Sequence, residues 1–337
     1  MLFRSKVRRA GFVSQQDYRK ALHNEWGLSL ALESRIGNDT RNIMLDFGYT
    51  PNALLNNMEI LGIDGAKMQA LIMSHGHFDH FGGLLGYLEK FRSRLPGDLS
   101  LYAGGEDNFC NRKTTSATPG HYSDWGVLDR NDLQKHRVRL VTCEKPTVVA
   151  DHAFTTGTIA RKSFERVLPN TQVEYFKTKG VGCDMPEANA KAGGKAVADE
   201  HIHEHGTCFN LKDRGLVVIS SCGHAGIINT ARQAMEVSGV KKVHAALGGF
   251  HLFPAPDVML VMERALVRRV AARLVGANER SVLDDPRFTE LWRAAGGTDG
   301  AVTAAACRAR APRIGFAGSP WSAAALVAPI HSEILIL

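Results

Sequence analysis

The segment that most constrains this chain is residues 71–84, LIMSHGHFDHFGGL, in which an apolar run leads directly into a cluster of histidines and an aspartate. His75, His77, Asp79 and His80 place four side chains of metal-ligating type within six positions. The run before them, residues 68–74, is short and apolar, as expected of a buried strand. Because loops beyond strand ends are where a rigid sheet presents reactive groups, this order predicts a fold that displays the cluster at the end of a strand.

The spacing within the cluster is suited to divalent metal ions. In an extended segment His75 and His77 project to the same side, so with a third nitrogen they can bind one ion and leave a position for water. In a tight turn Asp79 and His80 can bend toward a second ion about 3.5–4 Å from the first. An ordinary hydrogen-bonded histidine is the usual explanation for one such residue, but four residues of ligating type at this density favour a metal site.

The flanking sequence alternates strand and helix patterns. Residues 27–34 and 42–48 read as strands joined by a turn, and Thr50 followed by Pro51 predicts the start of a helix that ends near Gly62. Residues 179–204 are rich in glycine, alanine and lysine and predict a long loop or insertion. Further strands are predicted at residues 99–104, 137–143, 147–157, 207–219 (with a turn at 213–215) and 242–252, and further helices at 81–95 and 227–239.

The pattern His75-x-His77-x-Asp79-His80 after a buried strand resembles the signature of the metallo-β-lactamase superfamily. That resemblance implies an α/β (α+β) αββα sandwich with a dinuclear metal site at the sheet edge. It also implies a supporting role outside the ligand set for Asp46, which ends the strand at 42–48. Helix capping is the alternative role for Asp46.

Two later blocks extend the resemblance. SSCGHAGIIN offers Cys222 and His224, and GGFHL offers His251, each after an apolar strand. Together with residues 155–165 they resemble the branch of dihydropterin–ribofuranosylaminobenzene-phosphate synthases, over about residues 20–254, and imply His224 and His251 as metal ligands. For His251 a core histidine bonded to the backbone is the alternative.

The roles of two other residues stay open. His205 lies in HIHEH, where His201, His203 and His205 would share one side of an extended segment, and a solvated loop is an equal alternative to a ligand. Cys222 could bind a soft metal, but a small buried thiol is the favoured interpretation.

The resemblance implies two divalent ions, zinc first, with manganese or iron as alternatives, that activate a water and polarise the bond under attack. We therefore expect a hydrolase acting on a small phosphorylated or pterin-like molecule, with Asp79 as a catalytic residue as well as a ligand. Arg161 and the turn at Gly157 are candidates for holding a substrate phosphate. An iron-dependent redox enzyme and an inactive metal-binding relative are the alternative functions.

Three regions follow from these patterns: an N-terminal extension at 1–22, a metallo-β-lactamase-like domain at 23–256, and a helical or irregular segment at 257–337. The last of these departs from the resemblance, because the P-x-H-C-like block expected there is missing. Lysine is also absent after Lys242, while arginine and alanine increase. A changed reading frame in the encoding DNA is a hypothesis for this C-terminus.

Composition excludes several classes of partner. No run approaches the roughly 18 apolar residues of a membrane span, and MLFRSKVRRAGF lacks the apolar region of a secretory signal, so a cytoplasmic protein is expected. The net charge of +7 is scattered and predicts no nucleic-acid partner. The six cysteines form no C-x-x-C pair and predict reduced thiols. A small-molecule substrate remains, and the oligomeric state stays open.

Overall fold

The computed structural model describes residues 21–115, 121–163, 165–167, 170–251 and 333–336. These residues belong to one compact unit of the chain. Residues 253–324, most of the predicted extension at 1–22 and most of the predicted segment at 257–337 lie outside the described residues. The three predicted regions therefore stay predictions.

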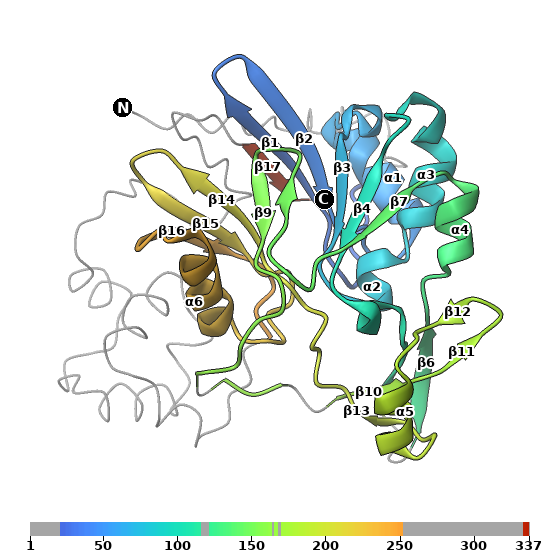
Figure 1. Cartoon of the computed structure of the whole chain (residues 1–337). Coiled ribbons are helices and arrows are strands. Elements are labelled where there is room, and N and C mark those ends of the chain that lie inside the picture. The colour runs from blue at the N-terminus through green and yellow to red at the C-terminus, as the bar shows by residue number, and fades with distance from the viewer. Residues whose placement is uncertain (1–20, 116–120, 164, 168–169, 252–332, 337) are drawn as a thin grey trace, which may run out of the picture. The chain divides into compact units, whose positions relative to one another are not determined.

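The first sheet has six strands in the order β17-β1-β2-β3-β4-β7. The pairs β17–β1 and β1–β2 are antiparallel, whereas β2, β3, β4 and β7 run parallel. The short segment β17 places residues near the C-terminus at the edge of this sheet (Figure 1). The bounds are β17 Glu333–Ile336, β1 Leu30–Ile36, β2 Asp39–Leu45, β3 Ala70–Met73, β4 Ser100–Ala103 and β7 Arg139–Thr142.

The second sheet has five strands in the order β16-β15-β14-β9-β8, of which only β15 and β16 pair in parallel. The strands are β16 Val243–Leu247, β15 Gly215–Ile219, β14 Thr207–Leu211, β9 Ala153–Thr155 and β8 Val148–Val149. Alternate residues of the two sheets share one buried cluster, with Ile43 and Ile72 from the first sheet and Val217 and Ile219 from the second. The two sheets therefore pack face to face.

Helices cover the outer faces of both sheets. Leu71 and Met73 of β3 point away from the second sheet and pack with Leu54 of α1 and Leu88 of α3. Ala234 of α6 packs on the outer face of β14 and β15. The helices are α1 Pro51–Leu61, α2 Phe78–Phe81, α3 Leu84–Phe91, α4 Arg130–Lys135, α5 Pro186–Ala192 and α6 Ile227–Ser238, with 3₁₀ turns at Gly65–Lys67, Arg92–Arg94 and Glu106–Phe109.

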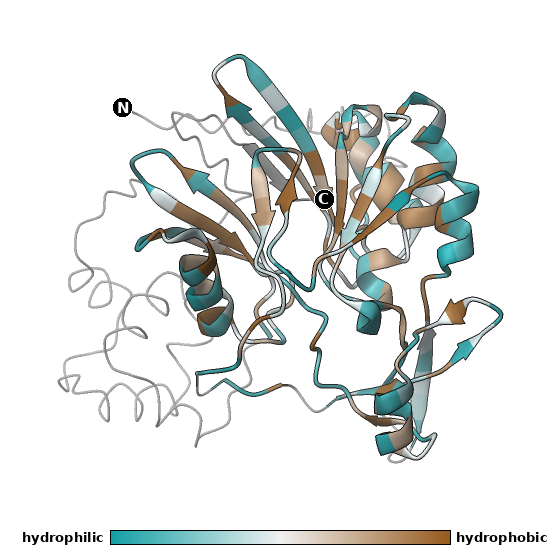
Figure 2. Cartoon of the chain, in the orientation of Figure 1, coloured by the Kyte–Doolittle hydropathy of each residue, from teal (hydrophilic) through white to brown (hydrophobic). Residues whose placement is uncertain are grey.

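This layering confirms the predicted αββα sandwich. Strands buried on both faces read as continuous apolar runs, which is why the sequence marks β3 and β15 so clearly. Figure 2 shows the apolar colouring concentrated on the inner strands and the hydrophilic colouring on the outer turns of the helices. Within the described residues no helix is long and apolar enough to span a membrane.

The local signals around the first helix are also confirmed. Thr50 caps α1 by accepting a hydrogen bond from Ala53 N at 3.2 Å, Pro51 occupies the first turn, and Gly62 ends the helix in the left-handed conformation. The hairpin of β1 and β2 turns where the sequence predicts.

Two smaller sheets lie outside the sandwich. One has the order β13-β10-β5-β6, and β11 pairs with β12 in the other. The strands are β5 Asn111–Thr115, β6 Tyr122–Gly126, β10 Thr171–Glu174, β11 Lys177–Thr178, β12 Val181–Gly182 and β13 Val197–Ala198. Of the two alternatives predicted for residues 179–204, a long loop is wrong, because that stretch contains β12, α5 and β13, and an insertion stays a prediction. The hydrophobic periodicity of this stretch is weak because its helix and strands are too short to show a repeating pattern.

The prediction of reduced thiols is wrong for one pair. Cys110 and Cys183 form a disulfide across a sequence separation of 73 residues. Cys143, Cys208 and Cys222 are free and buried. Spacing along the chain could not reveal the pair, because β5 and β12 are brought together only by the fold.

Candidate metal centre

The candidate site forms where several strands of both main sheets end. Asp46 follows β2, Ser74 and His75 follow β3, and Asp107 lies beyond β4. From the second sheet Cys222 and His224 follow β15, and His251 follows β16. Parallel strands end at a common edge, so residues from distant parts of the chain meet there.

Asp46 ties the first cluster to the sheet. Its carboxylate accepts hydrogen bonds from Ser74 N and Ser74 Oγ, each at 2.7 Å, and contacts His80 Nδ1 at 2.7 Å. Asp46 is fully buried and has a positive φ of 60°, a backbone conformation that few residues other than glycine adopt. An Nδ1–H donated to Asp46 turns His80 Nε2 toward the cluster, the arrangement by which carboxylates orient metal-binding histidines. The structure thus places Asp46 against His80, and its supporting role at a metal site stays a prediction.

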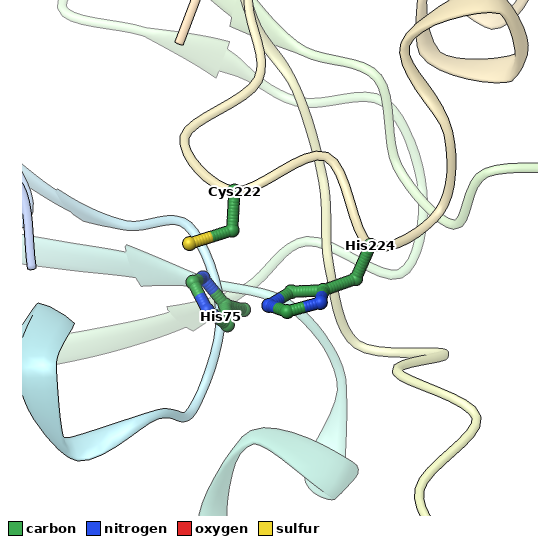
Figure 3. A group of neighbouring side chains, drawn as sticks. All are labelled: His75, Cys222 and His224. Carbon is green, nitrogen blue, oxygen red and sulfur yellow. The ribbon is translucent and has the colours of Figure 1, made fainter. Parts of the chain in front are cut away.

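A first group of donors consists of His75, Cys222 and His224, whose ligand atoms lie within 4.8 Å of one another. Figure 3 shows Cys222 and His224, from the segment between β15 and α6, directed toward His75. The rings of His75 and His224 are 4.9 Å apart, and Cys222 Sγ lies 3.0 Å from His80 Nε2. Cys222, left open by the sequence, is therefore inside the cluster.

Glu204 fixes the loop that carries these two residues. Its carboxylate accepts hydrogen bonds from the backbone N–H groups of Gly223 at 2.9 Å, His224 at 3.1 Å and Ala225 at 2.5 Å. Burial raises the pKa of Glu204, while these donors act in the opposite direction. Three N–H groups bound to one buried carboxylate hold the loop in one conformation, so His224 is placed by Glu204.

The second group of donors consists of His77, His201 and His224. His77 Nε2 and His201 Nε2 are 3.1 Å apart, and the rings of His201 and His224 stack at 4.0 Å. Trp125 of β6 meets the His77 ring edge-on at 5.1 Å. The glycine between His75 and His77 is required by packing, because a Cβ at Gly76 would meet the Asn108 carbonyl oxygen and Arg112 Nη1.

A buried arginine organises the remaining polar residues. Arg112 Nε donates to Asp199 Oδ2 at 2.8 Å, and Nη2 donates to Asp107 Oδ2 at 2.9 Å. Nη1 donates to the carbonyl oxygens of Asp107 at 2.7 Å and Cys110 at 3.0 Å. The Arg112 charge is the largest influence opposing burial on both carboxyls, and it holds the pKa of Asp107 and Asp199 below their ordinary values. Both therefore stay ionised.

His203 belongs to this network. Its Nδ1 lies 2.6 Å from Asp107 Oδ2 and 2.9 Å from Arg112 Nη2. An ionised carboxylate only accepts, so we assign the proton to His203 Nδ1, which leaves Nε2 as the free nitrogen. The pair Asp107–His203 thus has the same form as Asp46–His80 on the other side of the cluster.

All seven residues predicted for the site lie in this region. His75, His77 and His224 are in mutual contact, Asp79 Oδ2 is 3.6 Å from His80 Nε2, and the exposed ring of His251 stacks on His224 at 4.8 Å. That they bind metal stays a prediction. His205 is buried rather than in a solvated loop, and its Nε2 bonds the Met73 carbonyl oxygen at 3.1 Å.

Sequence reasoning missed Asp107, Arg112, Asp199, His201 and Glu204. The extended geometry assumed for HIHEH is wrong, because His201 has a positive φ of 49° and the chain turns there. His201, His203 and His205 consequently contact three different partners. The alternation of histidine with acidic residues in DEHIHEH was the available signal, since buried imidazoles need carboxylates to orient them.

The donor set fits divalent metal ions. Buried ring nitrogens of His75 (Nε2), His203 (Nε2) and His224 (both) have no hydrogen-bond partner among the described residues, and neither has Asp79 Oδ1. Buried polar atoms are normally paired, so several unpaired ones that converge indicate a partner that is not protein. Imidazole, thiolate and carboxylate together are typical ligands of zinc, manganese and iron. Asp107, Asp199 and His203 also lie close together, but Arg112 already supplies the positive charge there.

Burial keeps most of these histidines neutral. It lowers the pKa of His201 to about 3 and that of His205 to about 4, and it lowers the pKa of His75, His77 and His224 as well. His80 differs: burial opposes its charge, but Cys222, Asp46 and Asp79 outweigh burial and hold its pKa well above the ordinary value.

The metal-free protein is therefore expected to lose stability in mild acid. The unfolded chain takes up protons on histidine below about pH 6.5, whereas folded His201 and His205 do so only near pH 3 and 4. The contribution of His201 and His205 to the free energy of unfolding is then fully present above about pH 6.5. It falls as the pH decreases, by about 2 kcal/mol at pH 5 for each of these two residues. Urea unfolding of chelator-treated protein at pH 7.5, 6.0 and 5.0 measures this, and an unchanged midpoint would contradict it.

Comparison with known proteins agrees with this geometry. Residues 34–96 match the family model described as the metallo-beta-lactamase superfamily. A curated protein of Methanocaldococcus jannaschii, 7,8-dihydropterin-6-methyl-4-(beta-D-ribofuranosyl)-aminobenzene-5'-phosphate synthase, is 26% identical over 261 residues, which cover 77% of this chain and 81% of that protein. The predicted resemblance to the metallo-β-lactamase superfamily is confirmed.

Two other similarities are weaker. An uncharacterized protein of the same archaeon is 24% identical over 225 residues, covering 65% of this chain and 71% of that protein. Among solved structures, a metal-dependent hydrolase of the beta-lactamase superfamily aligns with a TM-score of 0.47 at 18% identity, covering 80% of this chain and 85% of the other. The superfamily match at 34–96 includes Asp46 and the cluster from His75 to His80. It ends before Arg112 and His201.

Proposed function

We propose that this chain is a metal-dependent enzyme whose centre, held by His75, His77, Asp79, His80, His224 and His251, acts on a small phosphorylated substrate with a pterin-like ring. Hydrolysis is the reaction we put first. The observation that carries the proposal is the meeting of buried, unpartnered imidazole nitrogens from both sheets at one edge. Two divalent ions, zinc first, would supply there an activated water and a Lewis acid.

The protein's own groups have distinct tasks in this proposal. Asp79 Oδ1 is buried without a hydrogen-bond partner among the described residues, so it can orient a water and accept its proton. Asp46 keeps the His80 ring in one orientation through the 2.7 Å contact at Nδ1. Glu204 does the same for the loop of His224, so the reacting geometry is held before substrate arrives.

Two groups near the cluster support the substrate class. Trp125 is half-buried beside His77 and offers a flat face on which a heteroaromatic ring can stack. Arg161 donates to the carbonyl oxygen of Glu200, the residue next to His201, and its side chain is partly exposed. A guanidinium in that place suits a phosphate. The name of the curated Methanocaldococcus relative, a synthase whose product joins a dihydropterin to a phosphorylated sugar, favours the same chemistry.

That relative makes synthesis a second candidate reaction. The deciding experiment reconstitutes the purified chain separately with zinc, manganese and iron and measures metal content and turnover. One arm follows hydrolysis of phosphate mono- and diesters. The other follows, by mass spectrometry, joining of an activated dihydropterin to the phosphorylated aminobenzene ribofuranoside. Turnover with iron alone would instead support a redox enzyme, and tight metal binding without turnover an inactive relative.

Replacing Trp125 by alanine is expected to raise KM for a pterin-containing substrate about 5- to 10-fold, because stacking of this kind contributes about 1 kcal/mol. The value of kcat should change little. Tyr122→Ala, an exposed aromatic of the same strand, is the matched control. Equal effects of the two substitutions would show that Trp125 does not contact the ring.

A cytoplasmic location and a small-molecule partner, without nucleic acid or membrane, remain part of the proposal.

A further inference from the structure

The segment between β13 and β14 brings a histidine into the cluster that the superfamily match does not include. His201 is buried, and its Nε2 lies 3.1 Å from His77 Nε2. The ring of His224 stacks on it at 4.0 Å with an interplanar angle of 17°. His201 is thus as close to two of the predicted ligands as they are to each other.

A simple hydrogen bond between His77 and His201 does not account for the site. Whichever Nε2 carries the proton, His201 Nδ1 and both nitrogens of His224 are left buried with no partner among the described residues. Two imidazole nitrogens on one tetrahedral ion, each about 2.0–2.1 Å from it, are about 3.3 Å apart, close to the separation found here.

We propose that His201 is a ligand of one metal ion together with His77 and His224, a role that rests on the proposed metal centre. Asp199 positions it. One Asp199 oxygen accepts the His201 backbone N–H at 2.9 Å, and the other lies 3.6 Å from both His77 Nε2 and His201 Nε2. Arg112 anchors that second oxygen at 2.8 Å, so the carboxylate cannot swing away from the two rings. The short segment of residues 199–205 therefore closes one side of the centre.

The test compares wild type with His201→Ala and His201→Cys after loading with zinc or cobalt. Metal per chain is measured by mass spectrometry, and affinity by competition with a chromophoric chelator. We expect His201→Ala to weaken binding of one ion at least tenfold while the other stays bound. His201→Cys should retain both ions and, with cobalt, add thiolate-to-metal absorption to the wild-type spectrum, because a thiolate replaces the imidazole.

The control is His152→Ala. His152 is also a buried histidine near a carboxylate, 3.3 Å from Asp39 Oδ2, but it lies at the turn between β8 and β9. Its loss should leave metal content and affinity unchanged. Unchanged affinity in His201→Ala, with no added absorption in His201→Cys, would overturn the role of His201 alone. If His201→Ala fails to fold, the cobalt spectrum of His201→Cys decides. Absence of metal from the wild type would instead overturn the proposed function.

Discussion

His224→Ala is expected to abolish metal binding at the candidate centre and to reduce turnover by at least a thousandfold. The ring of His224 lies between the rings of His75, His77 and His201, at 4.9, 4.8 and 4.0 Å. It is the residue shared by both donor groups. Removing it takes a nitrogen from each group, whereas any other single histidine substitution weakens only one.

The backbone around His224 should survive this substitution. Glu204 holds the loop through main-chain N–H groups, which alanine retains. Metal content by mass spectrometry and turnover under saturating metal are the measurements, with circular dichroism to verify the fold. His136→Ala, in the half-exposed cap of α4, is the control and should behave as wild type. Full metal occupancy in His224→Ala would refute the proposed centre.

Arg112→Met is expected to give the largest loss of stability, about 3–5 kcal/mol in the free energy of unfolding. The side chain is fully buried, and its guanidinium donates to both Asp107 and Asp199. Methionine fills much of the volume but leaves two buried carboxylates without a counter-charge. Arg112→Lys should recover little of the loss, because an ammonium cannot reproduce the planar set of donors.

Urea unfolding of the metal-free protein measures the effect of Arg112→Met directly. Arg35→Met is the matched control: Arg35 pairs with Glu33 at 2.9 Å, but the pair is partly exposed and should contribute less than about 1 kcal/mol. Adding Asp107→Asn and Asp199→Asn to Arg112→Met should restore part of the stability, since the buried charges are removed. Equal effects of Arg112→Met and Arg35→Met would show that the buried network contributes nothing.

Much of the fold could be predicted because its signals are local. Thr50 and Pro51 predict the start of α1, because the capping hydrogen bond of Thr50 joins residues only three positions apart. The apolar runs around β3 and β15 predict buried strands, because a strand covered on both faces carries apolar residues on both. The disulfide gave no such signal because its two cysteines lie 73 residues apart, and the elements of residues 179–204 gave none because they are too short to show a periodicity.

The candidate site likewise has one part that the sequence reveals and another that depends on the fold. The sequence by itself determined where residues of metal-ligating type are concentrated, since His75, His77, Asp79 and His80 share one short segment whatever the rest of the chain does. Only the tertiary structure decided what surrounds them. His201 meets His77 across 124 residues, His203 meets Asp107 across 96, and Arg112 meets Asp199 across 87. A contact over such separations depends on how the strands are ordered in the sheets, and ligand type and spacing carry no record of that order.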